Sequence, residues 1–156
     1  MPSGLLALAV AATLALPEAA RYRFEEFRVP AEAVTRAAGP ALDTPHARRY
    51  RTVLRQASSE PPNFAGHYRV VTWGCGTCCT EFAILDLTTG HSWFAPFYNA
   101  CGYPPGSQES DAGLLYKVDS QLFIAIGARN EKVWGIDYYR WNGRSLELLP
   151  ADRSRK

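Results

Sequence analysis

The sequence lacks most of the features that would assign a function directly. No apolar run reaches the roughly 20 residues of a membrane-spanning helix, and a net charge of +2 is too small to indicate nucleic acid or an anionic membrane as the partner. No two acidic residues stand at a spacing that indicates general acid–base catalysis, and no motif indicates a cofactor. The length of 156 residues suits one globular domain.

The chain opens with a short apolar segment. Residues 5–16, L-L-A-L-A-V-A-A-T-L-A-L, have the length of a signal-peptide core, and Ala15, Ala19 and Ala20 suit cleavage after them. No Lys or Arg precedes this run, and no cysteine follows it that would carry a lipoprotein anchor. We expect residues 1–20 to be a signal peptide and residues 21–156 to form one β-rich domain, periplasmic or secreted, without a stable membrane anchor.

The four cysteines are concentrated in one part of the chain. Cys75, Cys78 and Cys79 lie in one glycine-containing turn, and Cys101 lies in a later loop. In an exported chain they favour disulfides over free thiols or metal ligands, because the compartment is oxidising. Four cysteines allow three pairings, and their spacing alone does not select one. We expect a scaffold held by two disulfides.

Two chemical alternatives concern the same turn. Cys75 and Cys78 have the C-x-x-C spacing of a thiol–disulfide oxidoreductase, but residues 80–90 have the pattern of a strand and a hairpin. No helix dipole is then available to stabilise a thiolate. A zinc ion would need the cysteines together with His67 or His91, and no second paired motif is present. We therefore expect structural disulfides and no metal.

Residues 21–60 predict a lead-in and one helix. Charged, proline and aromatic residues over 21–30 indicate an edge strand or an extended segment, and residues 31–38 a helical turn or two. Within residues 46–56, the apolar side chains of Tyr50, Val53 and Leu54 stand at the i, i+3, i+4 spacing of an amphipathic helix, which the prolines at 61 and 62 end.

Residues 61–150 have the pattern of antiparallel strands and form the expected β core. T-T-G at 88–90 and N-G at 142–143 are hairpin signals, because glycine supplies the positive φ of a tight turn. Residues 99–111 are a loop rich in Gly, Pro and Ser. The predicted strands span residues 68–73, 82–87, 92–97, 114–118, 122–126, 134–141 and 145–149.

A faint internal repeat indicates how these strands are grouped. V-V-T-W-G at 70–74 aligns with F-I-A-I-G at 123–127, and a hairpin glycine follows sixteen residues later in both, at Gly90 and Gly143. Each half would be a strand, a loop, a strand, a tight turn and a strand, the layout of a propeller blade. We expect a mainly β, antiparallel fold of two small sheets or blade-like units packed together, with one short N-terminal helix.

Three side chains near the cysteine turn form a candidate functional cluster: His67, Trp73 and Glu81. Strand alternation places Glu81 on the same face as Ala83 and Leu85, where burial would raise its pKa as a general acid requires. A histidine beside a cysteine could act as the base for a nucleophile. The structural alternative is that the histidine is part of the fold and that the carboxylate faces solvent at a sheet edge, and no catalytic residue is predicted.

The aromatic residues either fill the space between the sheets or form a platform for a sugar or a peptide. Tyr138 and Tyr139 are consecutive and therefore point to opposite faces of a strand, which would leave one of them exposed. Asp86 and Asp137 lie near turns and are expected to cap backbone amides. The aromatic residues concerned are Trp73, Trp93, Trp134, Tyr138, Tyr139 and Trp141.

Several of these motifs, in this order, resemble an uncharacterised family of exported bacterial proteins. They are N-F-A-G-H-Y at 63–68, W-G-C-G at 73–76 and Y-Y-x-W-x-G at 138–143, and the likeness covers residues 62–149. The C-G-x-x-C spacing of the family implies that Cys75 pairs with Cys79. Cys78 and Cys101 are additions to that pattern, and their obvious use is a second bridge that ties the loop to the turn. The resemblance implies no activity.

These observations indicate an exported, non-enzymatic binding or interaction module of the bacterial cell envelope. Its partner would be an envelope protein or a small ligand, not a nucleic acid. The alternative is a thiol–disulfide oxidoreductase that uses the C-x-x-C-C turn. A third hypothesis is a small hydrolase that uses Cys78 or Glu81 with His67.

Overall fold

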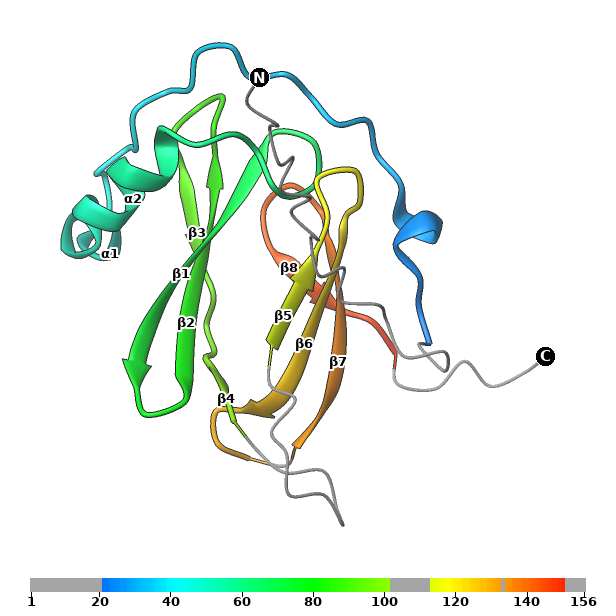
Figure 1. Ribbon diagram of the computed structural model, residues 1–156. Helices are drawn as coiled ribbons and strands as arrows, with labels where there is room; N and C mark the ends of the chain where they lie inside the picture. The colour runs from blue at the N-terminus through cyan, green and yellow to red at the C-terminus, as the bar shows by residue number, and fades with distance from the viewer. Residues whose placement is uncertain (1–20, 102–112, 133, 151–156) are drawn as a thin grey trace, which may run out of the picture.

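The computed structural model describes residues 21–101, 113–132 and 134–150 (Figure 1). These residues form a mainly antiparallel β structure with few helices, so the predicted fold class is confirmed. The expected signal peptide over residues 1–20 lies outside the described residues. So does most of the loop expected over residues 99–111.

The described helices all precede the first strand. The α1 helix (Pro45–Arg49) begins after Thr44, whose hydroxyl accepts a hydrogen bond from the amide three residues on at 3.0 Å and caps the helix. The α2 helix (Arg51–Ser58) follows Tyr50, where a φ of −98° and a ψ of 20° interrupt the helical geometry. The helix predicted over residues 46–56 is therefore present, but it is divided into two segments.

The lead-in before these helices differs from its prediction. Residues 21–30 contain a short 3-10 helix, η1 (Phe24–Phe27), in place of an edge strand, and residues 31–38 are not helical. The cause is side-chain burial, since Tyr22 and Phe24 pack into a core cluster on the second half of the sheet. Isolated backbone hydrogen bonds, instead of a continuous ladder, join the lead-in to its neighbours.

The strands form two antiparallel meanders. The first is β1–β2–β3 and the second is β6–β7–β8, with β5 on the other edge of β6. Gly90 and Gly143, at φ 81° and 91°, lie in the two expected hairpin turns. In chain order the strands are β1 (Tyr68–Gly76), β2 (Cys79–Asp86), β3 (Ser92–Phe94), β4 (Asn99–Ala100), β5 (Gly113–Tyr116), β6 (Leu122–Arg129), β7 (Trp134–Trp141) and β8 (Leu146–Leu148).

The short strand β4 joins the two meanders into one eight-stranded sheet. Asn99 and Ala100 pair with β2 on one side and with β6 on the other. Gly127 makes this approach possible, because at its φ of 144° a Cβ atom would lie 2.5 Å from the Ala100 carbonyl oxygen. The two predicted units are therefore present and packed together, and they share a continuous hydrogen-bonded path through β4.

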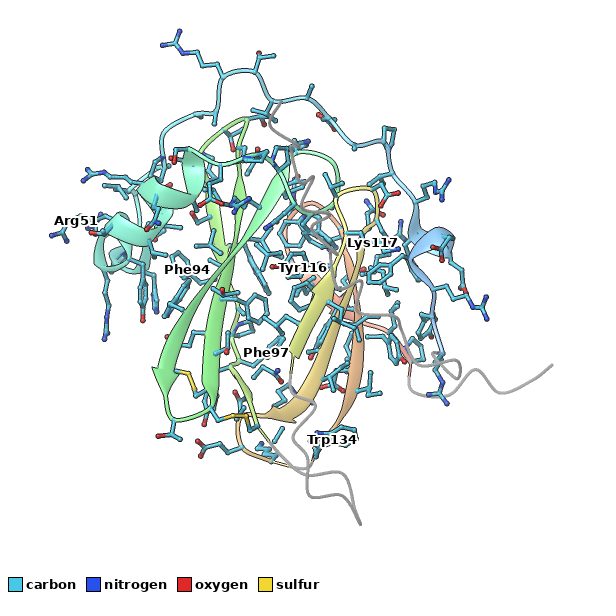
Figure 2. The ribbon with its side chains drawn as sticks, in the orientation of Figure 1. Arg51, Phe94, Phe97, Tyr116, Lys117 and Trp134 are labelled. Atoms are coloured by element: carbon cyan, nitrogen blue, oxygen red, sulfur yellow. A yellow bond between two sulfur atoms is a disulfide. The ribbon has the colours of Figure 1, made fainter. Side chains whose placement is uncertain are left out.

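The hydrophobic core has three parts. The largest lies between the meanders, where the side chains of Phe97 and Tyr116 project (Figure 2). A second lies between the helices and the outer face of β1–β2, where Phe94 packs, and a third lies under the lead-in. Buried members of the central part are Phe64, Ala65, Val70, Phe82, Ile84, Phe123, Ala125, Tyr139 and Trp141.

Candidate functional site

Two disulfides close the cysteine turn at the tip of the β1–β2 hairpin. Cys75 is bonded to Cys79, the pairing that the resemblance implies, and Cys78 is bonded to Cys101. The second bridge joins the turn to the residue after β4, where the Cys101 amide also donates a hydrogen bond to the Cys78 carbonyl at 2.8 Å. Both bridges thus lie at the end of the sheet where the meanders meet.

This pairing places Cys75 and Cys78 in different disulfides. A C-x-x-C oxidoreductase needs its two motif cysteines to pair with each other, and Cys79 begins strand β2 instead of a helix. None of the four sulfurs is the free thiolate that a zinc site requires. Within the part of the chain that the structure describes, no group of three or more His, Cys, Asp or Glu side chains could hold a metal ion.

Trp73 and Glu81 of the candidate cluster do lie together. They are opposite each other in the β1–β2 ladder, and Oε2 of Glu81 accepts hydrogen bonds from Trp73 Nε1 at 2.6 Å and from the Tyr50 hydroxyl at 3.1 Å. The Tyr50 and Trp73 rings stack with their centroids 4.3 Å apart. The carboxylate therefore connects the break between α1 and α2 to the sheet.

Further aromatic contacts make this group part of the helix–sheet interface. Phe94 meets Trp73 edge-on with the ring centroids 6.0 Å apart, and the Arg49 guanidinium lies 5.6 Å from the centroid of Tyr50. Tyr50, Trp73 and Glu81 are half-buried, and none of them lines the pocket described below. The arrangement suits the attachment of the helices better than the binding of a ligand.

His67 does not join Trp73 and Glu81. It directly precedes β1, whereas Trp73 is six residues further along, about 20 Å in an extended strand. His67 Nδ1 lies 3.0 Å from Oε1 of Glu32, and its Nε2 lies 3.6 Å from Oδ1 of Asp86. The three residues of the candidate cluster are thus divided between the two ends of β1.

Asp86 is fixed at the T-T-G turn, as predicted for a capping residue. Its Oδ1 accepts hydrogen bonds from the amide and hydroxyl of Thr88 at 2.8 and 2.6 Å and from the Thr89 amide at 3.3 Å. Burial alone would raise the pKa of this carboxyl, but these hydrogen bonds and the nearby His67 outweigh burial, so the pKa is lowered. Asp86 is therefore negatively charged at neutral pH.

A pocket of about 280 Å³ opens beside Asp86, between β3 and the β7–β8 hairpin. Ile84 and Trp141, only 1% and 2% exposed, form its buried side. The half-buried rings of Tyr68 and Trp93 complete its aromatic lining. Small-ligand sites have this mostly apolar character, and the volume lies just below their usual range. The remaining lining residues are Asp86, His91, Ser92, Gly143 and Arg144.

Tyr68 is held in the pocket by its aromatic neighbours. Its ring lies 4.2 Å from that of His67 and 5.2 Å from that of Trp141. Trp141 Nε1 is buried and makes no hydrogen bond of ordinary geometry with a described atom. Burial raises the pKa of the Tyr68 hydroxyl, and the Trp141 N–H beside it opposes this effect only in part. The hydroxyl is therefore a neutral donor and acceptor at neutral pH.

Two predictions about strand β7 are wrong. Neither Tyr138 nor Tyr139 is exposed, because Tyr139 packs into the central core and Tyr138 is covered by Tyr22 of the lead-in, with ring centroids 5.3 Å apart. Asp137 does not cap a turn, since it lies within β7 with Oδ2 3.6 Å from Nε of Arg129. The prediction that the aromatics fill the core is right for Tyr139 and Trp141.

Asp86, Trp93 and Trp141 are notable in the sequence, but nothing in the sequence places them around one pocket. Asp86 and Trp93 flank the T-T-G hairpin, and Trp141 and Arg144 flank the N-G hairpin. Both hairpins are predicted, but no sequence signal places them side by side. The sequence pattern most closely related to the pocket is the excess of aromatic residues at the bases of the two hairpins.

Comparison of the chain with protein families, with curated proteins and with solved structures finds no match. The functional interpretation of the pocket therefore depends on its own residues.

Proposed function

We propose that this protein is an exported, non-enzymatic binding module of the bacterial cell envelope, and that the pocket between β3 and the β7–β8 hairpin holds its ligand. The observation that carries the proposal is the combination of aromatic rings with one acidic and one basic side chain around a cavity of about 280 Å³. Trp93 and Tyr68 offer ring surface, and Asp86 and Arg144 offer polar contacts. A small-ligand site typically has this composition.

The fixed position of these groups supports the proposal. Asp86 is held by the turn amides and hydroxyl that bind its Oδ1, and the Tyr68 ring is packed between His67 and Trp141. Groups that are ordered before binding lose little conformational entropy when a ligand arrives. The pocket therefore needs no large rearrangement to act as a site.

The exported location is supported separately. Disulfides persist in oxidising compartments, and two disulfides join four cysteines of this chain. The apolar segment at residues 5–16 has the length of a signal-peptide core. Within the described residues, no helix has the length and apolar character needed to cross a membrane.

NMR titration of ¹⁵N-labelled protein tests the proposal. The four tryptophan indole N–H signals are local probes: Trp93 and Trp141 report on the pocket, and Trp73 and Trp134 report on other surfaces. We expect at least one class in a panel of neutral sugars, free amino acids, dicarboxylates and tripeptides to shift the first pair and leave the second unchanged. The proposal is wrong if no class shifts the first pair, or if the shifts occur only at Trp73 and Trp134.

A further inference from the structure

We infer that the ligand of this pocket is the pyranose ring of a neutral sugar, an inference that rests on the proposed function of the pocket. A pyranose ring has an apolar C–H face and a rim of hydroxyl groups, each of which donates and accepts hydrogen bonds. The pocket offers an aromatic surface for the face and fixed polar groups for the rim. Three features of the lining support this match.

The aromatic surface is the first feature. Trp93 is half-buried, so part of its ring faces the cavity, while Trp141 supports it from the core with ring centroids 5.7 Å apart. Phe82 also contacts Trp93, at 6.5 Å between centroids. These contacts fix the Trp93 ring, and a fixed flat ring gives a large contact area at little cost in side-chain entropy.

The polar groups are the second feature. The Thr88 and Thr89 amides both bind Oδ1 of Asp86, so the second carboxylate oxygen is not used by these amides and can accept a hydrogen bond from a sugar hydroxyl. The Tyr68 hydroxyl donates or accepts, and it lies beside Gly143 at the rim. A carboxylate and a neutral hydroxyl together match the alternating donors and acceptors of a sugar better than they match an anion.

The charge of the lining is the third feature. Asp86 and Arg144 have opposite signs, which favours a ligand without net charge. A zwitterionic amino acid is the other neutral choice, but it would depend on two ion pairs. Oδ1 of Asp86 is already occupied by the turn and lies 3.6 Å from Nε2 of His67, and Arg144 is exposed at the hairpin tip, where ion pairs contribute little.

The shape of the rim indicates where a longer sugar chain would leave. The cavity of about 280 Å³ has room for one ring. Gly143 has no side chain, and a Cβ atom there would have the Tyr68 hydroxyl, at 3.8 Å, as its nearest neighbour. A substituent on the bound ring can therefore pass over Gly143, so a free monosaccharide and the end of a glycan are both compatible with the pocket.

Titration with two sets of probes tests the inference. One set contains glucose, N-acetylglucosamine, methyl β-glucopyranoside and cellobiose; the other contains glycine, alanine, lysine and glutamate. We expect at least one sugar to give saturable shifts of the Trp93 and Trp141 indole signals with a Kd on the order of 1 mM, and the amino acids to give none. Methyl glucoside or cellobiose binding as tightly as glucose identifies the end of a glycan, whereas glucose binding alone identifies a free sugar.

The two hypotheses fail in different ways. Saturable binding of amino acids without sugars overturns the sugar assignment and leaves the pocket as a ligand site. Binding in neither set overturns the sugar assignment, and if the broader panel also leaves Trp93 and Trp141 unmoved, it overturns the proposed function as well.

Variants connect the binding to the pocket. Trp93→Leu keeps an apolar side chain but removes the aromatic ring, and we expect at least about tenfold weaker sugar binding. Trp134→Leu is the matched control (Figure 2). Trp134 begins β7 and Trp141, which lines the pocket, ends it, so this variant should bind sugar as the wild type does. Tyr68→Phe keeps the ring packing and removes only the hydroxyl, so a folded variant with unchanged affinity would remove Tyr68 from the site. Equal loss in Trp93→Leu and Trp134→Leu would overturn the assignment.

Discussion

Trp73 donates its indole N–H to Oε2 of Glu81 across the β1–β2 ladder at 2.6 Å, and the Tyr50 hydroxyl donates to the same oxygen at 3.1 Å. One carboxylate oxygen thus connects the helix break to the outer face of the first meander. The core cluster beneath it, which contains Leu54 and Leu85, forms only while the helices stay on the sheet. Glu81 is therefore expected to contribute to stability.

Replacement of Glu81 tests this role. Glu81→Ala leaves the Trp73 and Tyr50 donors without their acceptor, which should lower the free energy of unfolding by about 1–2 kcal/mol. The estimate is modest because the site is half-buried and water can reach part of it. Urea denaturation measures the change. Glu25→Ala is the control, since Glu25 is exposed and its cation partner Lys117 is 3.8 Å away; a change in Glu81→Ala no larger than in this control would contradict the prediction.

The two disulfides should contribute unequally to stability. Cys78 and Cys101 are 23 residues apart, and closing that loop in the unfolded chain corresponds to about 3 kcal/mol, against about 2 kcal/mol for the four-residue separation of Cys75 and Cys79. The double variant Cys78→Ser/Cys101→Ser should therefore be the less stable of the two serine pairs.

The long bridge also holds β4 against the first meander, so its removal should loosen the junction between the two halves. Thermal unfolding of the oxidised protein, the reduced protein and both double variants provides the measurement. We expect a clearly lower Tm after full reduction. An unchanged Tm on reduction, or a larger loss in Cys75→Ser/Cys79→Ser, would refute this account of the scaffold.

Substitution of Gly90 and Gly143 by alanine separates the energetic cost of a positive φ from the cost of a steric overlap. Both have positive φ, at 81° and 91°, so alanine at either position is strained by about 1–2 kcal/mol. At Gly90 a Cβ atom would also overlap the Gly39 carbonyl oxygen, whereas at Gly143 its nearest atom is the Tyr68 hydroxyl at 3.8 Å. Gly90→Ala should therefore cost at least about 3 kcal/mol and Gly143→Ala clearly less. Urea denaturation of both variants measures the difference. Equal losses of stability would mean that the lead-in around Gly39 moves away from a side chain at position 90 at little cost.

The sequence predicts the features that depend on local pattern. The hairpins at Gly90 and Gly143 carry turn signals that act within four residues, and the helix around Leu54 has the i, i+3, i+4 period of a buried face. Both are present. The internal repeat also predicts the two meanders, because the order of strands and turns is a property of the chain itself.

The features that the sequence does not predict depend on contacts between distant segments. Strand β4 has two residues in a Gly/Pro-rich stretch, too few to show any period, and it exists because Gly127 lets it approach β6. The lead-in is shaped by the burial of Tyr22 and Phe24 on a surface about a hundred residues away in the chain. The pocket likewise requires two hairpins to meet. His67 lies far from Glu81 because Glu81 pairs with Trp73, and β1 is extended from its start beside His67 to Trp73.

Asp86 makes stability depend on pH in a defined direction. Although burial would raise its pKa, the hydrogen bonds from Thr88 and Thr89 and the nearby His67 lower it in the folded state, below its ordinary value of 3.8. A depressed folded pKa means that the ionised carboxylate stabilises the fold above the unfolded pKa. This contribution is lost as pH falls from about 3.8 through the folded value.

Asp86→Asn isolates the effect, because asparagine keeps a side-chain oxygen for the turn amides but has no charge to lose. The free-energy difference between wild type and variant should be constant near pH 6 and should shrink as the pH is lowered towards about 2. Urea denaturation at a series of pH values measures it, with Asp119→Asn as a control for the loss of a carboxylate elsewhere. A difference that stays constant, or grows, on acidification would show that the turn does not favour the ionised form. In that case Asp86 would still be ionised at neutral pH, but the turn hydrogen bonds would not be what fixes its carboxylate, and the argument for an ordered polar group in the pocket would weaken.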